Sequence, residues 1–120
     1  MAVPILKQGP FLIATIQAAL TDSDVLQLRD DVMAQVTRHR SRGIIVDVTA
    51  LDVMDSFVSR SLQGISRMTR LRGAETVIVG IQPEVAFAMV RLGMDTGSVR
   101  TALDLEEGLG DLESRVGRGP

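Results

Sequence analysis

The chain has 120 residues, of which 45% are hydrophobic and 23% are charged, and its formal net charge is −2. These values are typical of one ordinary globular domain. The absence of cysteine excludes a disulfide scaffold, a thiolate metal site and a cysteine nucleophile. Because the chain lacks a Lys/Arg block as well as Trp and Tyr, we expect no nucleic-acid partner.

Two further expectations come from the apolar residues. The longest apolar runs are far shorter than the roughly 20 residues of a membrane-spanning helix, and the opening segment MAVPILKQG is too brief for a signal peptide. We therefore expect no membrane partner and a cytoplasmic location. With only three Phe as aromatic residues, the core is thin for a domain of this size, so we also expect self-association.

The first third of the chain predicts two strands and a helix. The apolar segments VPILKQG and PFLIATIQ flank the turn signal Gly9-Pro10, which indicates a β-hairpin or two adjacent strands. An amphipathic helix then begins at Asp22 or Ser23, either of which can cap its first turn, and ends near the segment RSRG. Its predicted buried positions recur at helical spacing: Val25, Leu28, Val32 and Val36.

The middle of the chain predicts a strand–helix–strand unit. GIIVDVT at 43–49 and ETVIVGI at 75–81 are β-branched and apolar, as expected of strands buried on both faces. The helix between them begins near Ser56 and stops at Gly73, with Val58, Leu62, Ile65 and Met68 as its buried positions. A unit of this length predicts two parallel strands.

The last third predicts two helices around a short strand. QPEVAFAMVRLG has Pro83 in its first turn and Gly93 at a left-handed C-terminal cap, with Val85, Met89 and Leu92 buried. An extended piece follows around SVRTA, and a last helix, weakened by Gly108 and Gly110, is marked by Leu105, Leu109, Leu112 and Val116. The whole predicts an α/β domain over residues 1–116, with a mixed sheet of four or five strands and about four helices, and a frayed tail at 117–120.

Three aspartates follow the buried strand at 43–49. Asp47, Asp52 and Asp55 are placed where ligands bind at the carboxyl edge of open α/β sheets, and their oxygens suit Mg²⁺ or a phosphate acceptor. Aspartate is also a common turn and cap residue. The segment LIATIQAA lacks the acidic pair that a receiver-type phosphate acceptor needs, so we favour turn capping and predict neither metal nor cofactor.

Ser56 begins the predicted middle helix, where free N–H groups and the helix dipole suit a capping oxygen or a phosphate. Capping is the commoner role of a serine at this position. Phosphorylation would add about −1.5 to −2 charge, and the neighbouring Asp55 would offset the local gain. The larger effect of such a phosphate would fall on a partner surface, while Phe57 is either core packing or part of that surface.

The sequence contains no catalytic motif. The single histidine, His39, lies among cationic residues and is expected to be solvated, and no nucleophile elbow, phosphate-binding loop or GxGxxG follows a strand. Arg60, Arg67 and Arg70 fall on the polar side of the middle helix, either as a solvated face or as a surface for an acidic partner. We therefore expect a protein that is not an enzyme.

Three segments together carry a family resemblance: GIIVDVTALDVMDSF, LRGAETVIVGIQPEVAFAMVRLGMD and TALDLEEGL. They resemble the STAS domain proteins of the anti-sigma-factor-antagonist family over nearly the whole chain. The serine in DSF and the segment GIQPEVA are most similar to the RsbS-type scaffold branch, which belongs to the bacterial stressosome. The resemblance implies a STAS fold with a mixed sheet and packed helices.

The resemblance also implies a regulatory role in the general stress response. Such scaffolds assemble with RsbR-like STAS paralogues, hold an RsbT-like serine kinase, release it when a serine is phosphorylated, and are reset by an RsbX-like phosphatase. Transferred to this sequence, the acceptor is Ser56, with Ser59 one turn later as the alternative. Asp55, Phe57 and Arg60 are the predicted partner-contacting residues.

Two other functions stay open from the sequence. The first is a single-domain anti-sigma-factor antagonist that binds an anti-sigma kinase and joins no large particle. The second, more remote, is a Mg²⁺-dependent phosphotransfer enzyme that would use Asp47, Asp52 and Asp55.

Overall fold

The computed structural model describes residues 3–93, 96–97 and 99–116, so the predicted tail at 117–120 lies outside the described residues. Strands and helices follow one another in the order β1 (Ile5–Gln8), β2 (Phe11–Thr15), α1 (Asp22–His39), β3 (Gly43–Asp47), α2 (Ser56–Leu71), β4 (Glu75–Val79), α3 (Pro83–Arg91), β5 (Arg100–Ala102) and α4 (Leu105–Val116). None of the helices in the described ranges is long and apolar enough to cross a membrane.

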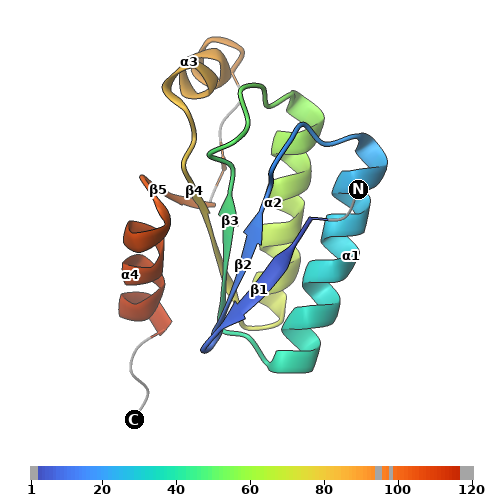
Figure 1. Ribbon diagram of the computed structural model, residues 1–120, viewed down its shortest axis with the longest axis vertical. Coiled ribbons are helices and arrows are strands. Elements are labelled where there is room, and N and C mark those ends of the chain that lie inside the picture. The colour runs from blue at the N-terminus through green and yellow to red at the C-terminus, as the bar shows by residue number, and fades with distance from the viewer. Residues whose placement is uncertain (1–2, 94–95, 98, 117–120) are drawn as a thin grey trace.

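The five strands form one mixed sheet in the order β1-β2-β3-β4-β5. The hairpin prediction is confirmed, because β1 pairs antiparallel with β2 across the Gly9 turn. The predicted parallel unit is confirmed as well: β3 pairs with β4 in the register Ile45↔Val77, and β2 and β5 extend the parallel part on either side. All carboxyl ends of the parallel strands therefore meet at one edge of the sheet, beneath α3 (Figure 1).

Helices cover both faces of the sheet. Helices α1 and α2 lie side by side on one face, and α4 lies on the other (Figure 1). The larger core cluster joins α1 and α2 to side chains such as Leu12, Ile44 and Ile78, all at most 2% exposed. A smaller cluster lies between α4 and the opposite face, and its buried members are Phe11, Ile13, Ile45, Val77, Val79 and Leu112.

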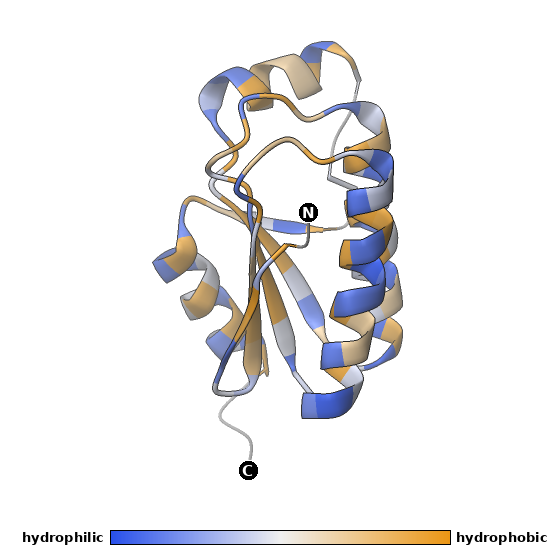
Figure 2. Cartoon of the chain, turned by 45° about the vertical axis from the view of Figure 1, so that its right-hand side comes forward, coloured by the Kyte–Doolittle hydropathy of each residue, from blue (hydrophilic) through white to orange (hydrophobic). Residues whose placement is uncertain are grey.

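The sequence explains this layering through hydropathy. The central strands are apolar along nearly their whole length, because both of their faces are covered, whereas the helices alternate hydrophobic and hydrophilic residues (Figure 2). In α1 the four predicted buried positions are confirmed. The cap of α1 differs from the prediction: Thr21, and not Asp22 or Ser23, accepts the N–H of Asp24, whose side chain accepts the Thr21 N–H in a capping box.

Two predicted core residues are wrong. Met68 in α2 is 39% exposed, and Thr69 takes the buried position, where its hydroxyl lies 2.9 Å from that of Thr76 on β4. Leu92 is 72% exposed because α3 ends at Arg91 and only Val85 and Met89 of this helix are buried. Helical spacing allows a step of either three or four residues after Ile65, so apolar periodicity could not decide between Met68 and Thr69 as the buried residue.

Gly108 has a packing role that helix propensity does not predict. A Cβ atom on this residue would lie 2.6 Å from Cγ1 of Val79 and 2.9 Å from Cδ1 of Ile45. The glycine therefore allows α4 to approach the sheet closely, which offsets its unfavourable helix propensity.

Candidate functional site

The candidate site begins where β3 ends and the chain turns into α2. Asp55 is the N-cap of α2: its carboxylate accepts the backbone N–H of Val58 at 2.8 Å, and its carbonyl accepts the N–H of Ser59 at 3.0 Å. Ser56 is therefore the first residue of the helix and not its cap. Because Asp55 performs the capping, the Ser56 side chain is left exposed at the helix start.

The sequence predicted that all three aspartates before Ser56 cap turns, and the structure confirms this role for Asp47 and Asp55. Asp47 accepts the N–H of Thr49 at 2.9 Å and its hydroxyl at 2.6 Å, which closes the turn after β3. Asp55 is the helix cap, and Asp52 is exposed. Within residues 3–93, 96–97 and 99–116, no three acidic or histidine side chains gather in a way that could hold a metal ion. The geometry therefore gives no support to the Mg²⁺-dependent phosphotransfer hypothesis.

The two candidate serines differ in exposure. Ser59 is 5% exposed and lies on the buried side of α2, whereas Ser56 is exposed. Phe57 is half-buried and packs against the larger core cluster, and Arg60 is exposed one turn after Ser56. An enzyme acting on the folded domain would therefore meet the hydroxyl of Ser56 and not that of Ser59.

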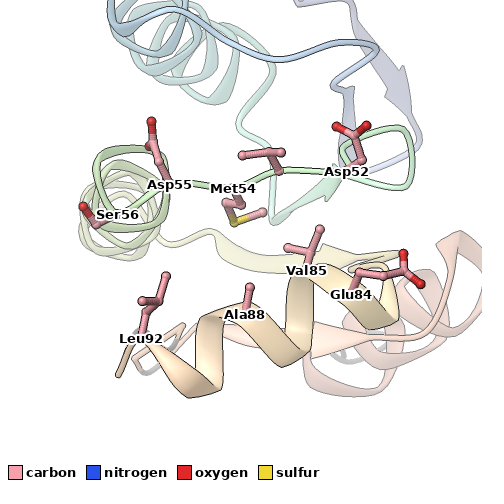
Figure 3. A pocket seen from close by; sticks show the side chains of 9 residues that line it. Asp52, Met54, Asp55, Ser56, Glu84, Val85, Ala88 and Leu92 are labelled. Atoms are coloured by element: carbon pink, nitrogen blue, oxygen red, sulfur yellow. The ribbon is translucent and has the colours of Figure 1, made fainter.

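A groove runs beside Ser56, between the 52–56 loop and α3. Its volume is about 510 Å³, and its lining residues are Asp52, Val53, Met54, Asp55, Ser56, Glu84, Val85, Ala88 and Leu92. Figure 3 shows Val85, Ala88 and Leu92 pointing from α3 toward the loop, with Met54 between the two elements, while the carboxylates of Asp52 and Asp55 point away from α3. The groove thus has an apolar floor and an acidic rim.

The outer side of α3 adds more apolar surface to this region. Phe87 and Val90 lie outside the groove lining and are each more than 60% exposed, as are Leu92 and Val53 of the lining itself. The guanidinium of Arg91 lies 5.5 Å from the centre of the Phe87 ring. Contiguous apolar exposure of this kind marks interaction surfaces.

Sequence reasoning did not connect α3 with Ser56. It expected Leu92 to be buried and assigned no site role to Glu84, Val85 or Ala88. These residues reach Ser56 only because β3 and β4 are parallel neighbours, so that the segments following them meet at the same sheet edge. A usable signal was the run FAMVRL, which is more apolar than one buried helix face requires.

The remaining predicted residues lie elsewhere. Arg60, Arg67 and Arg70 are exposed, as predicted for the polar side of α2. His39 is the last residue of α1, at the opposite end of the helix layer from Ser56 (Figure 1).

Comparison with known proteins agrees with this geometry. The sequence profile of the STAS domain matches residues 2–108. The RsbT co-antagonist protein RsbRA of Bacillus subtilis (strain 168) is 32% identical over 83 residues, which cover 69% of this chain and 30% of RsbRA. The chain thus matches less than a third of the length of that relative.

Two solved structures match nearly the whole chain. A serine-to-glutamate variant of RsbS from Moorella thermoacetica is 35% identical, with a TM-score of 0.80 and coverage of 94% of this chain and 96% of that one. A chain in a structure of the stressosome, a signal integration and transduction hub, is 34% identical, with a TM-score of 0.75. The match covers 93% of this chain and 97% of that one. The chain therefore belongs to the STAS domain family, and along almost its whole length it is similar to RsbS.

Proposed function

We propose that the chain is a non-enzymatic, RsbS-like stressosome scaffold that holds a serine kinase and releases it when Ser56 is phosphorylated. One observation carries the proposal: Ser56 is exposed at the start of α2, on the lining of the apolar groove, while Ser59 is buried. The alternative acceptor Ser59 would require α2 to leave the sheet before a kinase could reach its hydroxyl.

The electrostatics of the helix start support a switch that acts on a partner and not on the fold. The dipole of α2 favours a phosphate on Ser56 by about 0.3 to 1 kcal/mol when exposed. The Asp55 carboxylate on the preceding residue opposes part of that gain, because it is a like charge at the same helix end. The stability of the domain therefore changes little on phosphorylation, and the new charge acts on whatever binds the groove.

The proposed kinase-binding surface is the groove together with the exposed side of α3. Its apolar floor supplies contact area, Asp55 lines the groove, and Phe57 and Arg60 follow in the first turns of α2. Phosphorylation adds about −1.5 to −2 charge to a rim that already carries Asp52 and Glu84. An RsbT-like kinase that covers this rim must then desolvate the added charge, which weakens its binding, and an RsbX-like phosphatase restores binding.

The proposal includes assembly and location. Similarity to RsbS, to RsbRA and to a chain of the stressosome supports a large cytoplasmic assembly of this chain with RsbR-like STAS paralogues. In that assembly the chain needs no cofactor, because the chemistry at Ser56 is performed by the kinase and the phosphatase.

Phosphopeptide mass spectrometry after incubation with an RsbT-like kinase and ATP tests the site. We expect phosphate on Ser56 in the wild-type protein and in Ser59→Ala, and none in Ser56→Ala. Modification of Ser56→Ala at the wild-type rate would remove the assignment. A pull-down of the kinase with Ser56→Asp tests release separately: undiminished kinase binding by this variant would contradict the switch.

A second candidate is a single-domain anti-sigma-factor antagonist. The fold is compatible with it, because both core clusters are formed by residues of this one chain. Size-exclusion chromatography with an RsbR-like paralogue distinguishes the two, because a scaffold elutes with the paralogue in a large particle and a single-domain antagonist elutes alone.

A further inference from the structure

A second groove lies at the other end of the domain, where α1 and α2 end. Its volume is about 440 Å³, and three arginines line it: Arg40, Arg42 and Arg72. Arg40 follows α1, Arg42 precedes β3 and Arg72 follows α2, so residues about 30 positions apart in the chain meet there. We infer that this arginine groove docks a carboxylate-rich segment of a partner protein, at a surface separate from Ser56.

Within residues 3–93, 96–97 and 99–116, the guanidinium groups of Arg40, Arg42 and Arg72 form no ion pair. Among the residues that the structure describes, the ion pairs of arginine involve Arg29, Arg70, Arg100 and Arg115, and none involves a groove arginine. The nearby carboxylate of Glu75 forms its ion pair with Arg70 instead, with Oε2 of Glu75 lying 3.6 Å from Nε of Arg70. The groove therefore presents three positive charges to solvent on a chain whose net charge is −2.

The backbone beneath these arginines is held in place. The N–H of Arg42 donates to the carbonyl of Pro10 at 2.7 Å, and the carbonyl of Arg42 accepts the N–H of Glu75 at 3.1 Å. The N–H of Arg72 donates to the carbonyl of Thr69 at 2.9 Å. Fixed backbone positions keep the three arginines at one groove and so lower part of the ordering cost of binding a multivalent anion.

The conformation of Arg40 is a second and independent observation. Its φ is +50°, and it is the only described residue other than glycine with a positive φ. A left-handed residue at a helix C-terminus is usually glycine or asparagine, because a Cβ is strained there. Arg40 adopts this strained conformation although glycine would be unstrained there. Strained residues cluster at functional sites, so this conformation supports a binding role for the Arg40 side chain.

The surroundings favour a protein segment over other anions. Helix C-termini carry partial negative charge, which weakens binding of a lone small anion, so several carboxylates must act together. The net negative charge of the chain and its lack of Trp and Tyr disfavour nucleic acid and anionic membranes. Leu71, next to Arg72, is 88% exposed and supplies an apolar contact of the kind found in protein interfaces.

Titration of the full chain with a labelled peptide, Glu-Asp-Glu-Leu-Glu-Asp, tests this inference by fluorescence anisotropy and amide NMR shifts at low salt. We expect shifts at Arg40, Arg42 and Arg72 and not at Ser56. The double variant Arg42→Gln/Arg72→Gln should bind at least about tenfold more weakly, because it loses two charge-assisted contacts. Arg40→Gly should lose affinity severalfold while its backbone relaxes, and Arg67→Gln, outside the groove, should change it less than about twofold.

Four outcomes would overturn the inference. The first is equal binding of the peptide Gln-Asn-Gln-Leu-Gln-Asn, and the second is an equal loss in Arg67→Gln. The third is competition by inorganic phosphate at the concentration of the peptide, which would indicate a small-anion site. The fourth is self-association in sedimentation velocity that the groove substitutions abolish, which would make a second copy the occupant. Circular dichroism of each variant verifies that a loss of binding is not a loss of fold.

Discussion

The two ends of the domain use their charged side chains in opposite ways. At the Ser56 end, the carboxylates of Asp47 and Asp55 are hydrogen-bonded within the turn and the helix cap. At the arginine end, Arg40, Arg42 and Arg72 form no ion pair with any described residue. Asp47 and Asp55 therefore maintain local structure, whereas the groups proposed to meet partners are the exposed Ser56 and three exposed arginines. Substitutions matched between the two ends can test this difference.

The largest expected effect comes from two glycines with positive φ, one at each end. Gly80 follows β4 and has a φ of +79°. A Cβ on this residue would overlap the hydroxyl oxygen of Thr49, which donates a hydrogen bond to Asp47. Gly73, beside the arginine groove, has φ +84° and open space around it. We expect Gly80→Ala to lower the free energy of unfolding by about 2 to 4 kcal/mol, since backbone strain and overpacking add.

Gly73→Ala is the matched control, and it should cost only the backbone strain, about 1 kcal/mol. Urea unfolding of both variants measures the difference. Equal costs at the two positions would mean that the turn at the Ser56 end can move aside, which the contact with Thr49 argues against.

The next effect separates Asp55 from Ser56. Asp55→Ala removes the side chain that accepts the Val58 N–H, so we expect a loss of about 1 kcal/mol in the free energy of unfolding. Ser56→Ala removes an exposed hydroxyl and should change that free energy by less than about 0.5 kcal/mol. A reversed order in thermal or urea unfolding would show that Ser56 is the structural residue of the pair.

A smaller effect of opposite sign is expected at the arginine end. Arg40→Gly places a glycine at φ +50°, where it is unstrained, and removes no ion pair of the described chain. We expect the free energy of unfolding to stay the same or to rise by about 0.5 kcal/mol. A clear loss of stability in urea unfolding would instead assign Arg40 a structural role.

The smallest effect concerns an ion pair away from both ends. Arg100 Nε on β5 lies 2.9 Å from Oδ2 of Asp111 on α4, and this hydrogen bond lowers the pKa of the Asp111 carboxyl below 3.8. Asp111→Asn should therefore lower the free energy of unfolding by about 0.5 kcal/mol near neutral pH. Because the folded-state pKa is the lower one, the contribution of Asp111 is complete above the unfolded pKa and disappears as the pH falls through the folded value.

Unfolding of wild type and Asp111→Asn between pH 7 and pH 2.5 measures this dependence. The difference in the free energy of unfolding between the two proteins should be constant down to about pH 5. It should then decrease toward zero below pH 3.8, the ordinary pKa of Asp. A difference that widens on acidification would contradict the assigned direction of the pKa shift.

Most of the fold could be predicted from the sequence because its signals are local. Apolar runs such as GIIVDVT gave the buried strands, and Gly9-Pro10 gave the hairpin turn. Local signals were less reliable for details that depend on neighbours. Thr69 and not Met68 is buried because Thr76 on β4 offers its hydroxyl a partner, and Gly108 is explained only by the approach of α4 to Val79.

The candidate site was predicted in part. The pattern DSF after a strand located Ser56, and turn chemistry correctly gave Asp47 and Asp55 their structural roles. The two grooves could not be predicted, because each one combines segments about 30 residues apart. The basic runs RHRSR and RLRG each precede a strand, and only the parallel pairing of β3 and β4 brings their arginines together.

The most direct test of the central claim is the stoichiometry and position of phosphate after reaction with the RsbT-like kinase, measured by intact-mass and phosphopeptide mass spectrometry on wild type, Ser56→Ala and Ser59→Ala. The exposure of Ser56 and the burial of Ser59 predict one phosphate on wild type and on Ser59→Ala, and none on Ser56→Ala. Phosphate on Ser59, or on Ser56→Ala at the wild-type level, would contradict the account.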